Sequence, residues 1–195
     1  MDHEAYWKQR WAERKTGWDR GATSPALEHW FAGMEQLPER ILVPGCGSGY
    51  EVEWLARHGA RVTAVDIVPE PLDSLRQRLK VQELDAELVL GDLFDWEPTT
   101  PFDAIYEQTC LCAITKDQRQ AYAERLYRWL KPGGTLYALF AQTPWRNGPP
   151  WHCDLTEMRE ELFTPDRWIW PDDADFTLPH EAGFREDGYR LIHRP

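Results

Sequence analysis

The sequence predicts an α/β domain built around a doubly wound, mostly parallel sheet. Between residues 40 and 141, short apolar runs alternate with amphipathic segments long enough to be helices. Strands that are separated by helices pair in parallel, because the helix carries the chain back to the starting edge of the sheet. A glycine-rich turn follows the first strand, at the edge where open α/β sheets bind ligands. A length of 195 residues fits one such domain.

The individual elements follow from apolar runs and turn residues. Five strands are expected in the alternating region, at residues 40–44, 61–66, 86–90, 102–107 and 135–141. Three helices are expected between them, at residues 50–58, 70–80 and 117–130. Later strands at 167–170 and 188–193 bring the number to seven. Because no convincing helix joins these two, they predict an antiparallel edge strand.

The flanking regions are expected to form a helical N-terminal cap and a set of substrate loops. A helix at 24–36 is indicated by Ser24 as its N-cap and Pro25 in its first turn. Further helices are expected at 3–15 and at 155–163. The single domain over residues 1–195 is thus expected to have a cap at 1–38, a ligand-binding core at 39–141, and substrate loops with the sheet edge at 142–195.

Composition argues against several classes of function. The chain has 22 Lys and Arg against 33 Asp and Glu, which gives a formal net charge of −11. A chain this acidic is not expected to bind nucleic acid or an anionic membrane surface. Its first 20 residues lack the apolar segment of a signal peptide, and its four cysteines form no CxxC pair. We expect a cytoplasmic monomer that acts on a small molecule.

The glycine loop (residues 45–49) has the spacing G-x-G-x-G. Gly45, Gly47 and Gly49 let the backbone adopt positive φ and approach a ligand closely. The helix that follows presents free N–H groups and the positive end of its dipole. Dinucleotide binding requires G-x-G-x-x-G, and Tyr50 stands where the last glycine would be needed. The spacing therefore disfavours an NAD-binding oxidoreductase.

Two acidic residues end consecutive expected strands next to this loop. Asp66, which lies 21 residues after Gly45, could accept hydrogen bonds from both hydroxyls of a ribose. Asp92 could accept one from an adenine amino group, with Leu93 covering the ring. Each acid could instead cap the turn that follows its strand. Together they favour a nucleoside pocket without a pyrophosphate, in which the helix N-terminus holds an amino-acid carboxylate.

This organisation resembles the class I methyltransferases that depend on S-adenosylmethionine (SAM) and release S-adenosylhomocysteine. The matching residues are 43–51, Asp66, 91–92 and 130–134. The resemblance implies a Rossmann-like sheet and SAM as the cofactor. It also implies that the cofactor is bound by residues of the glycine loop and of the next two strand ends: Gly45, Cys46, Gly47, Gly49, Asp66, Ile67, Asp92 and Leu93.

The flanking segments are similar to one branch of that class, the thiopurine methyltransferase superfamily. The similar residues are 6–11, 16–19, 102–114 and 147–151, and the thiocyanate, halide and thiol methyltransferases fit better than the thiopurine enzymes. The resemblance places Trp7, Trp11 and Trp18 over the cofactor. Aromatic faces stabilise a sulfonium by about 0.5–2 kcal/mol. The alternative for Trp7 and Trp11 is an i, i+4 pair in the core.

Candidate residues for the acceptor side come from the later segments. Gln108 stands where thiopurine enzymes carry arginine, so it is expected near the cofactor's methionine end or the substrate entrance, and anionic thiopurines are disfavoured. Gln108 and His152 are weak catalytic candidates. Trp18, Cys110, Trp145 and Trp151 are candidates to bind the substrate, although buried cysteines are usually apolar filler.

Three classes of function remain open from the sequence. The first is S-methylation of small thiols or related soft nucleophiles such as thiocyanate, halides or chalcogens. The second is O- or N-methylation with His152 or His180 as the base. The third is an NAD-binding oxidoreductase or a SAM-binding module without activity. No residues have the spacing of a metal site, so none is expected.

Overall fold

The computed structural model describes residues 3–145 and 147–195. The chain divides into two compact units, of which the first ends at Trp96 and the second begins at Glu97. The part that the structure describes contains no helix with the length and apolarity needed to cross a membrane.

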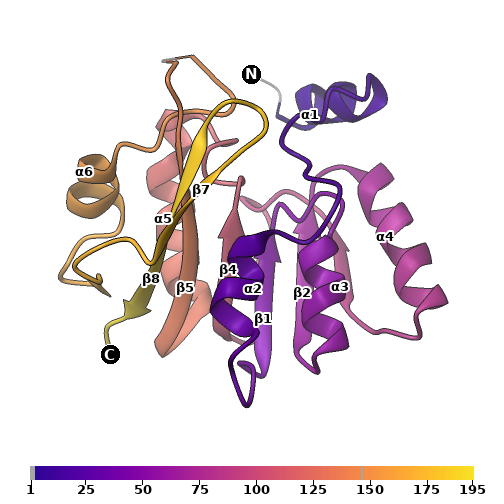
Figure 1. Ribbon diagram of the computed structural model, residues 1–195, viewed down its shortest axis with the longest axis horizontal. Helices are drawn as coiled ribbons and strands as arrows, with labels where there is room; N and C mark the ends of the chain where they lie inside the picture. Colours follow the sequence, from indigo (N-terminus) through magenta and orange to yellow (C-terminus); the bar gives the residue numbers. More distant parts are fainter. Residues whose placement is uncertain (1–2, 146) are drawn as a thin grey trace. The chain divides into compact units, whose positions relative to one another are not determined.

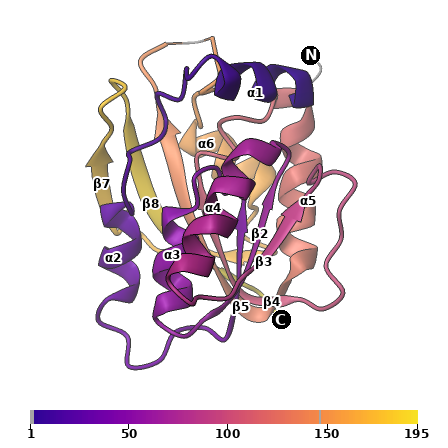
Figure 2. The same cartoon turned by 90° about the vertical axis from the view of Figure 1, so that its right-hand side faces the viewer.

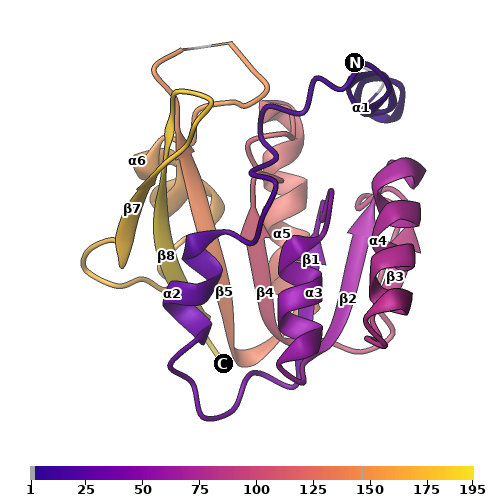
Figure 3. The same cartoon turned by 45° about the vertical axis from the view of Figure 1, so that its right-hand side comes forward.

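The first unit contains a parallel sheet with the strand order β3–β2–β1 (Figure 3). Two of its strands are buried along almost their whole length, as their continuous apolar sequences predict for a covered parallel sheet. Two helices connect the strands and lie on the same face of this sheet (Figure 3). These elements are β1 (Arg40–Pro44), α3 (Tyr50–Arg57), β2 (Arg61–Asp66), α4 (Pro69–Val81) and β3 (Glu87–Leu90).

Two helices precede this sheet, α1 (His3–Ala12) and α2 (Pro25–Phe31). The predicted cap of α2 is confirmed, because the Ser24 side chain accepts a hydrogen bond from the Ala26 N–H. The predicted end of α2 at residue 36 is wrong. The helix stops at Phe31, and Gly33, a poor helix former, lies in the turn that follows.

The second unit combines one parallel pair of strands with antiparallel ones. β4 pairs in parallel with β5, and β5 pairs antiparallel with β8. Both β6 and β7 pair antiparallel with β8, which confirms the predicted antiparallel edge. Figure 1 shows β7 beside β8. Its elements are β4 (Phe102–Gln108), α5 (Arg119–Trp129) after a short 3₁₀ turn (Lys116–Gln118), β5 (Leu130–Gln142), α6 (Leu155–Glu157) continued by a π-helical turn (Met158–Leu162), β6 (Trp168–Ile169), β7 (Phe176–Pro179) and β8 (Arg185–His193).

Two details of the second unit differ from the prediction. The described residues form eight strands rather than seven, because β7 was not foreseen. Residues 131–134 were expected to be a turn but belong to β5, where the pairing with β4 shifts register between Phe102 and Ala104. Gly133, with φ of +79°, absorbs this irregularity, since a residue without Cβ adopts positive φ at little cost.

Candidate active site

The glycine loop has the backbone that its sequence predicts. Gly45, Gly47 and Gly49 have φ of +59°, +50° and +70°, in the left-handed region that favours glycine. A Cβ on Gly49 would also overlap the side chain of Leu75 on α4. Gly49 therefore provides the close helix packing that the last glycine gives a dinucleotide site. Tyr50 is left to begin α3 beneath the guanidinium of Arg78, which lies 5.4 Å from the ring centre.

Asp66 lies at the end of β2 and holds the glycine loop in place. Its side chain is buried, and its Oδ2 accepts a hydrogen bond from Gly47 N at 2.8 Å. Its Oδ1 accepts one from Val68 N at 2.9 Å, so the residue does cap the turn after its strand. Burial raises the pKa of Asp66, while hydrogen bonds from the backbone of Val68, Gly47 and Ile67 oppose that rise. A carboxylate offers about four lone-pair sites, so these bonds leave acceptor capacity for a ribose hydroxyl.

Asp92 follows β3 at the same edge of the sheet. The backbone N–H of Gly91 donates to the carbonyl of Asp66 at 3.0 Å, which ties the two strand ends together. Asp92 Oδ1 accepts a hydrogen bond from Phe94 N at 2.8 Å, as expected for a turn-capping acid. Among the described residues no donor is recorded for its Oδ2, and Leu93 beside it is half-buried. The adenine contact of Asp92 and Leu93 stays a prediction.

The tryptophan cluster (Trp7, Trp11 and Trp18) lies on the N-terminal segment. Trp18 packs edge-on against Trp7 and Trp11, with ring centres 5.2 and 6.1 Å apart. A Cβ on Gly47 would lie 3.6 Å from Cζ2 of Trp11, so this ring covers the glycine loop. No residue of α1 is buried, and α1 lies at the end of the strands that carries the loop (Figures 1 and 2). A core pair of Trp7 and Trp11 is therefore excluded.

In the second unit, β4 ends at Gln108, whose amide group is fixed by two contacts. Its Oε1 accepts a hydrogen bond from the Tyr106 hydroxyl at 2.7 Å, and its Nε2 donates to Glu186 of β8 at 3.0 Å. Thr109 then adopts φ of +59°, and Cys110 is buried in the turn that follows. Burial of Cys110 fits a side chain that fills apolar space in the core. Its contact with substrate stays a prediction.

The segment after β5 forms the wall of a cavity of about 360 Å³. Trp145 packs edge-on against Phe184, a residue that lines the cavity, with ring centres 6.2 Å apart. Its Nε1 donates a hydrogen bond to Pro150 O at 3.0 Å. Trp151 is held by its backbone, whose N–H donates to Cys112 O at 2.7 Å. The residues that line the cavity are Gln142, Thr143, Pro144, His152, Gly183, Phe184 and Arg185.

Both candidate histidines use Nδ1 as a hydrogen-bond acceptor. His152 Nδ1 accepts from Thr143 N at 3.1 Å, and His180 Nδ1 accepts from Ala182 N at 3.1 Å. Only His152 lines the cavity, whereas His180 is buried and stacks on Phe184 with ring centres 4.3 Å apart.

The sequence matches the family model of thiopurine S-methyltransferase (TPMT) over residues 2–192. The chain belongs to the thiopurine S-methyltransferase family. It is 34% identical to thiocyanate methyltransferase 1 of Arabidopsis thaliana over 165 residues, which cover 82% of this chain and 71% of that protein. It is 30% identical to a thiopurine S-methyltransferase of Xanthomonas campestris pv. campestris over 205 residues, which cover 96% and 94%.

Solved structures show that the fold is that of SAM-dependent methyltransferases. A 1,6-didemethyltoxoflavin-N1-methyltransferase of Burkholderia thailandensis, with S-adenosylhomocysteine bound, superimposes with a TM-score of 0.77 at 19% identity, covering 98% of this chain and 87% of that one. Magnesium protoporphyrin IX methyltransferase of Synechocystis gives 0.74 at 13% identity, covering 99% and 98%. The predicted α/β, Rossmann-like class is confirmed, and the chain is a SAM-dependent methyltransferase.

The residues of the first unit fit this cofactor. The left-handed glycines bring the backbone of the glycine loop within reach of a ligand, and a buried carboxylate with remaining acceptor capacity lies beside it. The aromatic faces of the tryptophan cluster lie over the same loop, where they can stabilise a sulfonium. The individual contacts stay predictions, and so does independence from a metal ion.

Sequence reasoning missed several residues of this methyltransferase that shape the site. Ser48, Arg78 and Asp19 hold the glycine loop. Ser48 and Asp19 lie in segments that resemble the superfamily, but no role was predicted for either of them or for Arg78. Arg119 of α5 is fully buried and donates to the carbonyl of His152 at 3.1 Å, so it fixes the wall of the cavity. A charged residue in an amphipathic helix is normally exposed, so the burial of Arg119 could not be predicted from its sequence context.

Glu107, next to Gln108, is buried and carries a shifted pKa of about 7. Burial is the largest cause of the rise; the hydrogen bond from Leu111 N lowers the pKa, the Glu186 charge raises it, and the Arg119 charge lowers it. The ordinary value for the unfolded chain is 4.5. Between pH 4.5 and about 7 the folded chain therefore binds more protons than the unfolded chain.

We predict that folding stability falls as the pH rises through this window. The contribution of Glu107 is fully present below pH 4.5 and is lost as the pH passes about 7. Its size is roughly 3 kcal/mol. Denaturant unfolding at several pH values measures this slope. Glu107→Gln should flatten it, while Glu161→Gln at an exposed position should not; an unchanged slope in Glu107→Gln would refute the assignment.

Proposed function

We propose that this enzyme transfers the methyl group of SAM to the sulfur of small thiols or of thiocyanate. The proposal is supported by the family match together with the names of the relatives, which include the Arabidopsis thiocyanate methyltransferase and a probable thiol methyltransferase 2 of the same plant. The observation that carries it is the hydrogen bonding of the two histidines. Because the Nδ1 atoms of His152 and His180 both accept hydrogen bonds, neither histidine is available as an imidazole base for the acceptor.

The histidine geometry disfavours O- or N-methylation. A neutral imidazole whose Nδ1 accepts a hydrogen bond carries its proton on Nε2. His152 and His180 both accept at Nδ1, so neither offers a lone pair at Nε2 to an alcohol or ammonium group. SAM supplies a methyl group that is already activated by the sulfonium charge. A thiol with a pKa of about 8.5 is partly ionised at neutral pH, so it reacts without a protein base.

The cavity of the second unit provides a place for a small acceptor. Its volume of about 360 Å³ lies in the range of small-molecule sites. Phe184 gives it an apolar surface, while His152 Nε2–H and the guanidinium of Arg185 are donors on its wall. Gln108 cannot orient an anion as an arginine at its position would. Arg185 lines the cavity and pairs with Asp187 at 3.3 Å, and its remaining N–H groups support a thiolate or thiocyanate acceptor.

A panel of acceptors tests the proposal. Release of S-adenosylhomocysteine should be measured with alkyl thiols, aryl thiols, thiocyanate, iodide, a phenol and an amine at equal concentration. We expect the sulfur nucleophiles to be methylated fastest. A phenol or amine that exceeds every thiol would overturn the acceptor assignment, and the absence of any turnover with SAM bound would support a binding module without activity.

We predict that neither histidine is required for turnover. His180→Ala and His152→Ala should each keep kcat with an aryl thiol within about threefold of the wild type, since removing a general base costs about 10²- to 10⁴-fold. His152→Ala should raise KM more than His180→Ala, because only His152 lines the cavity. A loss of activity of that order on removing one imidazole would favour the O- or N-methyltransferase alternative.

We further infer that the enzyme works as a cytoplasmic monomer. The four cysteines form no disulfide within the described residues and are buried, which is the usual state of thiols in a reducing compartment. The acidic charge of −11 still disfavours nucleic acid and anionic membranes as partners. Light scattering of the purified chain gives its mass in solution, and a mass above 22.9 kDa would contradict the monomer.

A further inference from the structure

Ser48, in the middle of the glycine loop, is bonded on two sides. Its hydroxyl donates to Asp19 Oδ2 on the N-terminal segment, and its carbonyl accepts a hydrogen bond from Arg78 of α4. Ser48 is half-buried and lies between two glycines with positive φ. A loop with two flexible glycines can rotate its peptide groups easily. The two bonds of Ser48 therefore determine which way the loop's carbonyl and N–H groups point.

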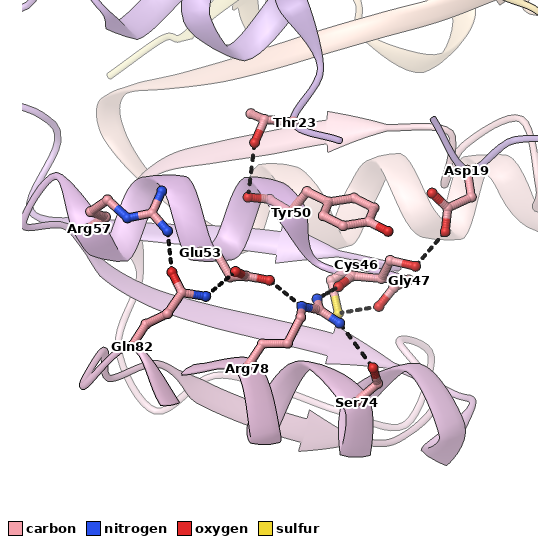
Figure 4. A network of polar contacts seen from close by, with 11 residues as sticks. Asp19, Thr23, Cys46, Gly47, Tyr50, Glu53, Arg57, Ser74, Arg78 and Gln82 are labelled. Atoms are coloured by element: carbon pink, nitrogen blue, oxygen red, sulfur yellow. Dashed lines mark hydrogen bonds and ion pairs between the residues drawn. The ribbon is translucent and has the colours of Figure 1, made fainter. Parts of the chain in front are cut away.

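Arg78 is itself held in one orientation. Its Nε donates to Glu53 of α3, and its Nη1 donates to Ser74 Oγ at 3.0 Å (Figure 4). Glu53 also accepts from Gln82, so the whole guanidinium is fixed between α3 and α4. A guanidinium fixed in this way directs the Ser48 carbonyl toward α4. A carbonyl turned to the ligand side would instead repel the carboxylate of an amino-acid moiety.

Asp19 connects this arrangement to the tryptophan cluster. Its Oδ1 accepts from Gly21 N at 2.7 Å, so the carboxylate is oriented by its own turn before it meets Ser48. Its neighbour in sequence, Trp18, packs against the rings of Trp7 and Trp11. Trp11 in turn covers Gly47. Breaking the bond between Asp19 and Ser48 would thus release the cluster from the loop.

We propose that Asp19, Ser48 and Arg78 are positioning residues that fasten the tryptophan cluster over bound cofactor. This inference rests on the proposed SAM contacts of the glycine loop. Arg78 orients the peptide group of Ser48 through a hydrogen bond to its carbonyl. Asp19 binds the Ser48 hydroxyl and thereby holds the tryptophan cluster over the glycine loop. The fastening controls how long the cofactor stays bound, whereas none of the three residues takes part in methyl transfer.

A double-mutant cycle tests this proposal. The rate constant for S-adenosylhomocysteine dissociation should be measured in the wild type, Ser48→Ala, Asp19→Ala and the double variant. We expect Ser48→Ala to accelerate dissociation about tenfold, as a bond to a charged acceptor implies. The same change in the Asp19→Ala background should add less than about twofold, because the bond is already absent. KM for SAM should rise while kcat at saturating SAM changes little.

Control variants show whether faster dissociation comes from losing the Ser48–Asp19 bond or from a general loss of stability. Binding to the wild type tests separately whether the cofactor binds at this loop. Ser48→Thr restores a hydroxyl and should recover slow dissociation, and Ser74→Ala removes another serine bonded to Arg78 without touching the N-terminal segment. Equal effects of Ser48→Ala in both backgrounds, or a Ser74→Ala variant that matches it, would overturn the proposal. A wild-type chain that binds no S-adenosylhomocysteine at all would instead refute the assignment of the cofactor to this loop.

Discussion

Asp66→Asn is expected to weaken SAM binding by roughly 10- to 100-fold, the cost of removing a charged acceptor from a buried hydrogen bond. The amide keeps one oxygen as an acceptor, but its NH₂ group is a hydrogen-bond donor. That donor would face another donor, either the Gly47 N–H or a ribose hydroxyl. Both the cofactor contact and the glycine loop are affected, because Asp66 Oδ2 holds Gly47. Isothermal titration calorimetry with S-adenosylhomocysteine measures the change.

Asp73→Asn is the matched control for this experiment. Asp73 is an exposed residue of α4 whose carboxylate pairs with Arg76. Its variant should bind as tightly as the wild type. Thermal unfolding of both variants shows whether the fold is retained. If Asp66→Asn binds as tightly as the wild type, Asp66 does not bind the ribose. If Asp66→Asn and Asp73→Asn lose the same affinity, the loss is not specific to Asp66.

The fold could be predicted best where buried strands produce continuous apolar runs. The structure confirms the predicted bounds of β1 and β2 residue by residue, because their sequences are apolar between clear turn residues. β7 (Phe176–Pro179) was missed because it has only four residues, alternates between half-buried and exposed, and ends in proline. Its pairing depends on β8, which the local sequence cannot reveal.

The candidate site shows the same division between local and long-range information. The glycine loop and Asp66 have fixed spacing along the chain, so the sequence could place them next to each other. Ser48 meets Asp19 and Arg78 over separations of 29 and 30 residues, and no pattern in the sequence marks those pairs. Glu107 lies in the segment 102–114 that resembles the superfamily, but its burial and raised pKa appear only in the structure.

A thiol is expected to be methylated far faster than the phenol of the same shape. Thiophenol and phenol form such a pair, and kcat/KM for each gives the preference. Ionisation alone favours an alkyl thiol of pKa about 8.5 over a phenol of pKa about 10 by roughly 30-fold, and it favours the more acidic aryl thiol by more than that. The greater nucleophilicity of sulfur increases the ratio, and neither His152 nor His180 presents a free Nε2 lone pair that could activate oxygen.

The pH dependence provides an independent check on this preference. With a thiol acceptor the rate should rise with pH until the thiol's own pKa is reached, because the thiolate is the reacting form. Thiols of different pKa should therefore shift the midpoint of the profile. A midpoint that stays constant for every thiol would indicate a protein base instead, and a phenol rate equal to the thiol rate would contradict the preference itself.

S-methylation is tested most directly by an acceptor that carries both a thiol and a hydroxyl, such as 4-mercaptophenol. SAM labelled with deuterium in its methyl group should be supplied, and the product analysed by mass spectrometry and NMR. We expect the label on sulfur, with one S-adenosylhomocysteine formed for each thioether. Label on oxygen would contradict the account, because it would require a base that His152 and His180, with Nδ1 engaged, do not supply.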